Sequence, residues 1–319
     1  MTPAPRRALS GKMPGAALDA APRKVHRRVW HLSVTDEMLD HHIDQIPHEL
    51  KQAHVHRGYR WGLTLQECFA SIFMLHNDTI NVWTHLLGAC YFIASSPFIM
   101  SEMPANSTAL DNVLMFTYIL SAFTCHFLSA AYHTFRGSDL STYKAFYRLD
   151  LTGIVILIAG SNFVGMYNAF IETSPLLVLV YLVPVSALLS VAVYLTNAAS
   201  CQGVEYDKAR VLTLAGSVAV GGVPIAHWLW AAQGDACFPY ALWPVVGLGL
   251  SYATGFLIFY FRIPECFFPG RLDILASSHQ FWHVLVFVAA YCWLHGMVSV
   301  FQCRIDGPSA LSGLPELGA

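Results

Sequence analysis

The chain has 319 residues, of which 55% are hydrophobic and only 12% are charged, and its mean hydropathy is +0.48. A soluble domain usually carries about 25% charged residues, so this composition excludes an ordinary soluble enzyme and indicates a membrane protein. The formal net charge of −2 does not by itself indicate a class of partner, and we expect no nucleic-acid ligand.

The N-terminal region differs from the rest of the chain in composition. Residues 1–60 are polar and rich in Ala and Pro, and they contain ten of the eighteen Lys and Arg residues. They lack the apolar run of a secretory signal peptide. We therefore expect a basic, largely disordered cytosolic arm over 1–60, a transmembrane domain over 61–303 and a short outer tail over 304–319.

Seven apolar segments follow the arm, and each is near the roughly 20 residues that a helix needs to span a bilayer. The sequence predicts an all-α, seven-helix transmembrane bundle with spans at about 79–99, 112–134, 148–169, 176–196, 211–231, 241–261 and 279–301. Because no internal repeat is visible, we expect these spans to form one domain.

The loop charges predict an orientation. The loops after the second, fourth and sixth segments carry Lys and Arg, whereas the alternate loops, at about 100–111, 170–175 and 232–240, carry none. Loops rich in Lys and Arg tend to remain in the cytosol. The sequence therefore predicts a cytosolic N-terminus and an extracellular or lumenal C-terminus.

Polar residues in the apolar segments converge at one depth. His133 falls in the last turn of the second segment, Asp150 in the predicted first turn of the third, and His279 and His283 at the start of the seventh, in the stretch SSHQFWH. The predicted topology brings all four to one level, just inside the cytosolic interface. Ser129 lies one turn before His133 on the same helix face.

Three histidines and a carboxylate at one level are typical of a metal site. Histidines four residues apart can bind one ion, and three protein ligands with an open position are typical of catalytic zinc. Asp150 and Ser129 then contact the water at that position. The alternatives are that the histidines bond only to neighbours and that Asp150 merely caps the third helix. A bis-histidine haem, using the pairs 85/283 or 126/295, is the second metal chemistry that the pattern allows.

Several stretches resemble the progestin and adipoQ receptor family, over about residues 57–301. They are HNDTINVWTHLLG, AAYHTF, YRLDLTGIVILIAGS and RIPECFFPGRLDILASSHQFWHVLV, and GGVPIAHWLW is nearest to the adiponectin-receptor branch. The resemblance implies a seven-helix fold with a cytosolic N-terminus. It also implies zinc held by His133, His279 and His283, with Asp150 and Ser129 beside the zinc-bound water, and leaves haem a remote alternative.

For function, the resemblance implies a receptor or signalling role first and zinc-dependent, ceramidase-like amide hydrolysis as the alternative. A purely structural zinc that fixes helices is a further alternative. Expected partners are membrane lipids such as ceramide or a free fatty acid, an extracellular protein ligand and a cytosolic signalling partner. The expected location is the plasma membrane or the Golgi and other internal membranes.

The eight cysteines are scattered without the CxxC spacing of a metal or redox motif. Cys237 and Cys303 both fall on the predicted outer side, where an oxidising compartment permits a disulfide. The sequence leaves open whether they pair or remain free thiols.

Overall fold

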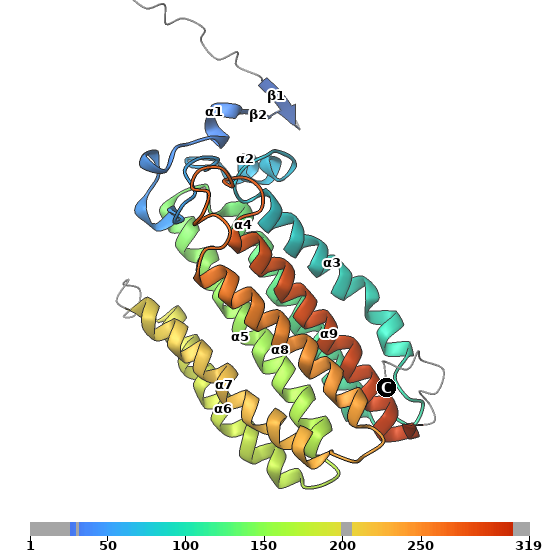
Figure 1. The fold of residues 1–319 in the computed structure, drawn as a ribbon. Coiled ribbons are helices and arrows are strands. Elements are labelled where there is room, and N and C mark those ends of the chain that lie inside the picture. The colour runs from blue at the N-terminus through green and yellow to red at the C-terminus, as the bar shows by residue number, and fades with distance from the viewer. Residues whose placement is uncertain (1–25, 30–31, 199–205, 309–319) are drawn as a thin grey trace, which may run out of the picture.

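The computed structural model describes residues 26–29, 32–198 and 206–308 of the chain. Seven long helices run side by side in a bundle, and each is long and apolar enough to cross a membrane (Figure 1). They are α3 (Thr79–Ser101), α4 (Ala109–Phe135), α5 (Leu140–Phe170), α6 (Pro175–Asn197), α7 (Asp207–Ala231), α8 (Phe238–Tyr260) and α9 (Ser278–Asp306). The structure thus has seven candidate spanning helices, as expected, and each predicted range lies within one of them to within one residue.

Helix α5 begins earlier than the apolar pattern predicts, which corrects the expected position of Asp150. The Asp139 carboxylate accepts hydrogen bonds from the backbone N–H groups of Ser141 and Thr142, at 2.8 and 3.1 Å, and so caps the helix. Asp150 therefore lies about three turns into α5 rather than in its first turn. The first turns of α5 are polar and therefore carry no hydropathy signal. For this reason the helix start predicted from the sequence was too late.

Helix α9 occupies the centre of the bundle and packs against α3, α4, α5 and α8. Its side chains Trp293 and Phe301 are among the largest fully buried ones. The Tyr118 hydroxyl on α4 donates to the Ala290 carbonyl of α9 at 2.8 Å. Helices α6 and α7 pack against each other and against α5, at the periphery of the bundle (Figure 1). Helix α9 thus contacts the first three helices of the seven and the sixth.

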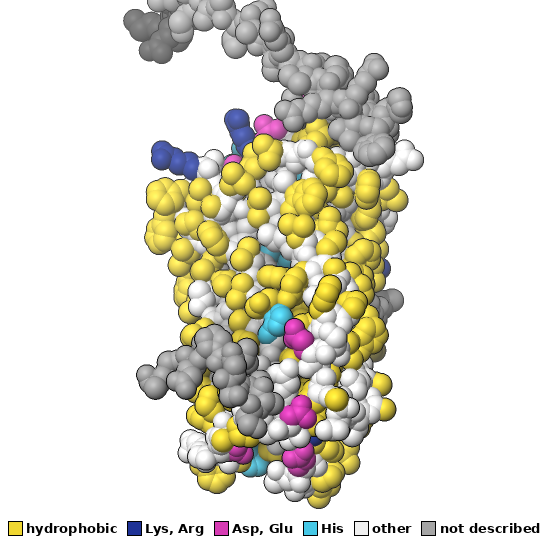
Figure 2. Space-filling view, turned by 90° about the vertical axis from the view of Figure 1, so that its right-hand side faces the viewer, with side chains coloured by type: hydrophobic (Ala, Val, Ile, Leu, Met, Phe, Trp, Pro, Cys, Tyr) yellow, Lys and Arg dark blue, Asp and Glu magenta, His cyan; other side chains and the backbone are white. Residues whose placement is uncertain are grey.

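Hydrophobic side chains cover most of the bundle face that Figure 2 shows, between its two ends. Large exposed apolar residues occur on α3, α6 and α8, for example Phe98, Leu176 and Leu250. Since apolar surface on this scale is disfavoured in water, the outer surface of the bundle is suited to contact with lipid tails.

The second half of the N-terminal region packs on one end of the bundle. It contains strands β1 (His26–Val29) and β2 (Leu32–Thr35), which pair antiparallel, helix α1 (Asp36–Leu39), and 3-10 helices η1 (Ile43–Gln45) and η2 (His48–Leu50). Helix α2 (Leu65–Ala70) and 3-10 helix η3 (Ser71–Phe73) lead into α3. Val34, Leu50, Val55 and Tyr59 are buried.

The expected largely disordered arm over 1–60 therefore does not describe its second half. The elements there have only three or four residues each, and their scattered apolar residues cover the end of the bundle, so they leave no periodic signal. The first 25 residues of that expected arm lie outside the described residues.

A disulfide joins the start of α8 to the last turns of α9, between Cys237 and Cys303. The pairing that the sequence left open is thus formed in the structure. We call this end of the bundle the disulfide end, and the opposite end, which carries His133 and His279, the histidine end.

Candidate metal centre

Three histidines from two helices converge at the histidine end. His133 lies near the end of α4, and His279 and His283 lie in the first two turns of α9. The Nε2 atom of His279 is 3.2 Å from Nε2 of His133 and 3.2 Å from Nε2 of His283. One ring nitrogen from each histidine lies within 4.8 Å of the other two. The structure thus brings together the three residues that the sequence proposed as ligands.

The spacing of these nitrogens fits a zinc ion. Three nitrogens at Zn–N distances of about 2.0–2.1 Å around a tetrahedral ion lie roughly 3.3 Å from one another. Two of the three Nε2 pairs are separated by nearly that distance. Three Nε2 lone pairs directed at one point repel each other unless a proton or a cation lies between them, so the donor set fits a cation.

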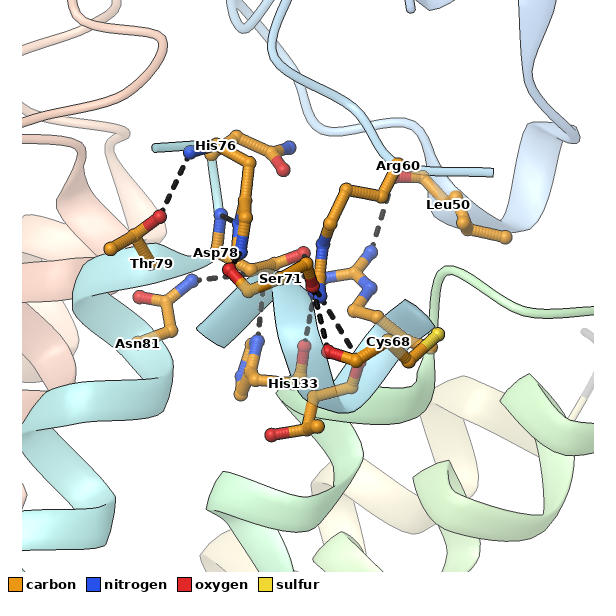
Figure 3. Close-up of polar contacts among 12 residues, drawn as sticks. Leu50, Arg60, Cys68, Ser71, His76, Asp78, Thr79, Asn81 and His133 are labelled. Atoms are coloured by element: carbon orange, nitrogen blue, oxygen red, sulfur yellow. Dashed lines mark hydrogen bonds and ion pairs between the residues drawn. The ribbon is translucent and has the colours of Figure 1, made fainter. Parts of the chain in front are cut away.

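The tautomer of His133 is fixed by a buried carboxylate. Nδ1 of His133 donates to Oδ1 of Asp78, at the N-terminus of α3, over 2.8 Å (Figure 3). The proton is therefore on Nδ1, and the Nε2 lone pair points at the other two histidines. Metal-binding histidines almost always donate their second nitrogen in this way, which fixes the ring and raises its basicity.

Asp78 is itself held ionised by two buried arginines. Arg136 Nη1 donates to Oδ1 of Asp78 at 3.3 Å, and Arg60 Nη2 lies 3.5 Å from Oδ2. Burial alone would raise the pKa of Asp78, but Arg136, the His133 hydrogen bond and Arg60 together hold that pKa well below its usual value. An ionised carboxylate is the form that accepts a hydrogen bond from His133.

Arg60 also ties this network to the backbone around His133. Its guanidinium donates to the carbonyls of His133 and Thr134 and to the Ser71 hydroxyl, the last at 2.6 Å (Figure 3). Arg136 donates to the Leu50 carbonyl at 3.2 Å. The N-terminal segment thus contributes to the support of the metal centre, although it supplies no ligand.

The start of α9 is fixed by a second buried carboxylate. Glu265, in the connection from α8, accepts hydrogen bonds from the Ser278 backbone N–H at 2.7 Å and from the Ser278 hydroxyl. His279 is the next residue. Because a carboxylate at a helix N-terminus satisfies free N–H groups and opposes the helix dipole, Glu265 sets where α9 begins and so where its two histidines lie.

Asp150 and Ser129 lie on the neighbouring helices α5 and α4. Ser129 is buried and Asp150 is half-buried, and the Asp150 carboxylate is near enough to interact with the Ser129 hydroxyl and with the His133 side chain. Neither side chain accepts a hydrogen bond from a ring nitrogen of His133, whereas Asp78 does. Sequence reasoning missed Asp78, Arg60, Arg136 and Glu265. An acidic residue directly before the first span, inside a motif already singled out, was the available signal for Asp78.

Of the two pairs that the sequence allowed for haem, His85 and His283 are not arranged to hold one. The rings of His85 and His283 are stacked with centroids 3.8 Å apart, which leaves no room for a macrocycle between them. His295 is hydrogen-bonded to the Tyr91 hydroxyl at 2.7 Å. The stacking therefore argues against a haem held by His85 and His283.

The chain is similar to a known protein family over the part that contains the three histidines. A family model described as haemolysin-III related matches residues 73–294, which include all three histidines of the group. The chain belongs to this family. The resemblance to progestin and adipoQ receptors is confirmed, and the protein is a multi-pass membrane protein of the adiponectin-receptor family.

Members of the haemolysin-III-related family from animals and plants are similar over most of the chain. The adiponectin receptor protein of Drosophila melanogaster is 31% identical over 257 residues, covering 79% of this chain and 57% of the receptor. Progestin and adipoQ receptor family member 3 of Mus musculus is 31% identical over 271 residues, covering 83% and 87%. Heptahelical transmembrane protein 3 of Arabidopsis thaliana is 28% identical over 288 residues, covering 77% and 83%. The chain thus spans little more than half the length of the Drosophila receptor.

Proposed function

We propose that this protein is a membrane receptor or signalling protein of the adiponectin-receptor type that holds one zinc ion through His133, His279 and His283. The observation that carries the zinc proposal is the Asp78–His133 hydrogen bond, which leaves the His133 Nε2 lone pair directed at two further histidine nitrogens. Similarity to receptors from two animal phyla supports the receptor role.

The zinc proposal is tested by metal content. Purified protein should contain about one zinc per chain by elemental analysis, and His279→Ala or His283→Ala should remove most of it. His295→Ala is the matched control, because it removes a histidine from the same helix at the opposite end. Wild-type protein without zinc, or equal zinc in all three variants, would overturn the site.

We further propose that the histidine end faces the cytosol and that the protein resides in the plasma membrane or the Golgi. Lys and Arg in the connections at this end support the orientation. A tag at the N-terminus should require permeabilisation before antibody staining. A C-terminal tag should stain in intact cells at the plasma membrane, or resist protease in intact internal vesicles. Both tags on one side would contradict the orientation.

A second function, zinc-dependent hydrolysis of a lipid amide such as ceramide, is favoured by Asp150. Bound zinc supplies Lewis-acid activation of water and of an amide carbonyl. The Asp150 carboxylate interacts with His133 and with the Ser129 hydroxyl, and we propose it as the general base that accepts a proton from the attacking water. An apolar hollow between α5, α7, α8 and α9, lined by Asn162, Trp228 and Trp293 among others, is suited to an acyl chain.

The two functions are separated by Asp150→Asn, which keeps the shape of the side chain but removes the base. If the protein hydrolyses ceramide, sphingosine release should fall about 10²–10⁴-fold, the usual cost of losing a general base, with zinc content unchanged. Binding of purified adiponectin to the protein in nanodiscs should be unchanged if the site is a scaffold. Normal receptor activity without hydrolysis would exclude catalysis as its basis.

A further inference from the structure

A second group of histidines lies against the metal centre, on its side toward the bundle core. His85 on α3 stacks on His283 with ring centroids 3.8 Å apart, and its ring lies 4.7 Å from that of His126 on α4. All three side chains are at least 96% buried. Three helices that surround the centre each contribute one ring to this group, which we call the core histidines: His85, His126 and His283.

Four ring nitrogens of the core histidines have no hydrogen-bond partner within the part of the chain that the structure describes. They are both nitrogens of His85, Nε2 of His126 and Nδ1 of His283. Stacked rings do not satisfy each other, because ring nitrogens form hydrogen bonds in the plane of the ring rather than through its face. Buried polar groups in proteins are nearly always paired with protein atoms or with ordered water.

The tautomers of these rings can be assigned from their other contacts. Nδ1 of His126 lies 2.8 Å from the Ala122 carbonyl oxygen, which can only accept, so Nδ1 carries the proton and Nε2 is an acceptor. If Nε2 of His283 binds the metal, its Nδ1 carries a proton and is a donor. Neutral His85 has one donor and one acceptor. The four unpaired nitrogens therefore comprise two donors and two acceptors.

Two donors and two acceptors permit a single chain of hydrogen bonds that runs in one direction. His283 Nδ1–H is the first donor, His85 accepts with one nitrogen and donates with the other, and His126 Nε2 is the final acceptor. His126 then donates through Nδ1 to the Ala122 carbonyl, which ends the chain. Water suits the gaps because a molecule can both accept and donate, and buried waters typically make about three hydrogen bonds to otherwise unpaired groups.

We propose that His85 and His126 hold bound water in a hydrogen-bonded chain that orients the ligand His283, as Asp78 orients His133. The inference rests on the proposed zinc site, because only a metal on Nε2 fixes the proton of His283 on Nδ1. His85 is a positioning residue on this account and contacts neither the metal nor a substrate.

The test compares His85→Phe with His85→Gln in the purified full-length protein. Phe keeps a flat ring that can stack on His283 but has no polar atom, whereas Gln loses the ring and keeps one donor and one acceptor. Zinc affinity is measured by competition with a chelator, and thermal stability is followed in parallel. We expect His85→Phe to weaken zinc binding about 10–100-fold, as loss of a ligand's hydrogen-bond partner does, and His85→Gln to retain most of the affinity.

His126→Phe, at the far end of the chain, tests the same idea without touching His283. It should weaken zinc binding by less than His85→Phe, and the double variant should lose little more than His85→Phe alone, because one chain is broken in each. Additive losses, or a His85→Gln variant weaker than His85→Phe, would show that packing alone matters and would overturn the inference. If wild-type protein binds no zinc, the proposed metal site fails instead, so the two failures are distinguishable.

Discussion

The two ends of the bundle use similar parts for different purposes. Each has a buried aspartate near a helix N-terminus that is paired with arginine, namely Asp78 with Arg60 and Arg136, and Asp111 with Arg304. At the disulfide end every oxygen of Asp111 is bonded to Thr108 or Arg304, in a closed arrangement beside the Cys237–Cys303 bond. At the histidine end Asp78 instead fixes a histidine whose other nitrogen remains available.

The difference shows that a buried carboxylate can have two roles: it can hold helices together, or it can orient a side chain that binds a metal. A carboxylate such as Asp111, which accepts from an arginine, a hydroxyl group and a backbone N–H, holds helices together. One that accepts from a ring nitrogen also decides which way a lone pair points. The histidine end is therefore expected to combine stability with metal binding, whereas the disulfide end is expected to supply stability alone.

The largest effect is expected for Asp78→Ala. Removing this carboxylate leaves Arg60 and Arg136 buried without their counter-ion, and breaking a buried ion pair costs about 3–5 kcal/mol of unfolding free energy. Zinc affinity should also fall about 10–100-fold. Denaturation in detergent and chelator competition measure the two effects. Asp111→Ala is the matched control, and it should lower stability while leaving zinc affinity intact. Loss of zinc in the control would remove the distinction between the ends.

A smaller effect is expected for Cys303→Ser at the disulfide end. The bond closes a loop with a sequence separation of 66 residues, and losing a native disulfide typically costs about 2–4 kcal/mol. The free energy of unfolding should fall by that amount, and the zinc content should not change. Cys292→Ser, which alters a free cysteine of the same helix, should leave both unchanged. A metal-free Cys303→Ser protein would show that the two ends are coupled.

The smallest effect is expected for Glu172→Gln. Glu172 pairs with Arg304 at 3.1 Å, but its side chain is 64% exposed, and exposed ion pairs contribute about 0–1 kcal/mol. Thermal unfolding should therefore shift barely, whereas Asp111→Ala, which removes the buried partner of the same arginine, should shift it clearly. Equal shifts would mean that burial does not distinguish the two carboxylates.

Much of the site could be predicted because its signals are local. His279 and His283 share a helix face through their spacing, and seven apolar segments place His133 at the same end as both. Asp78 and Arg60 could not be assigned in this way, since Asp78 meets His133 across 55 residues and Arg60 meets the His133 carbonyl across 73. Such contacts depend on how the segment before the first span folds back, and hydropathy does not encode that.

A similar limit explains why Asp150 lies deeper in its helix than the sequence predicted. The sequence treated its position as the start of a helix because apolar character begins there, whereas the backbone becomes helical at Leu140 after the Asp139 cap. Apolar patterning reports where the surroundings become apolar, and capping residues report where the helix begins. The two boundaries, Leu140 and about residue 148, differ by about two turns in α5.

The order of the ligands along the chain has a consequence for biosynthesis. His133 lies on the second spanning helix and its partners lie on the seventh, 146 residues later. A ribosome must therefore insert every span before the site can exist, and α9 must then enter between helices already in the bilayer. Under the proposed zinc site, metal uptake would therefore report a finished chain, and a truncated product that reaches the membrane would lack the metal.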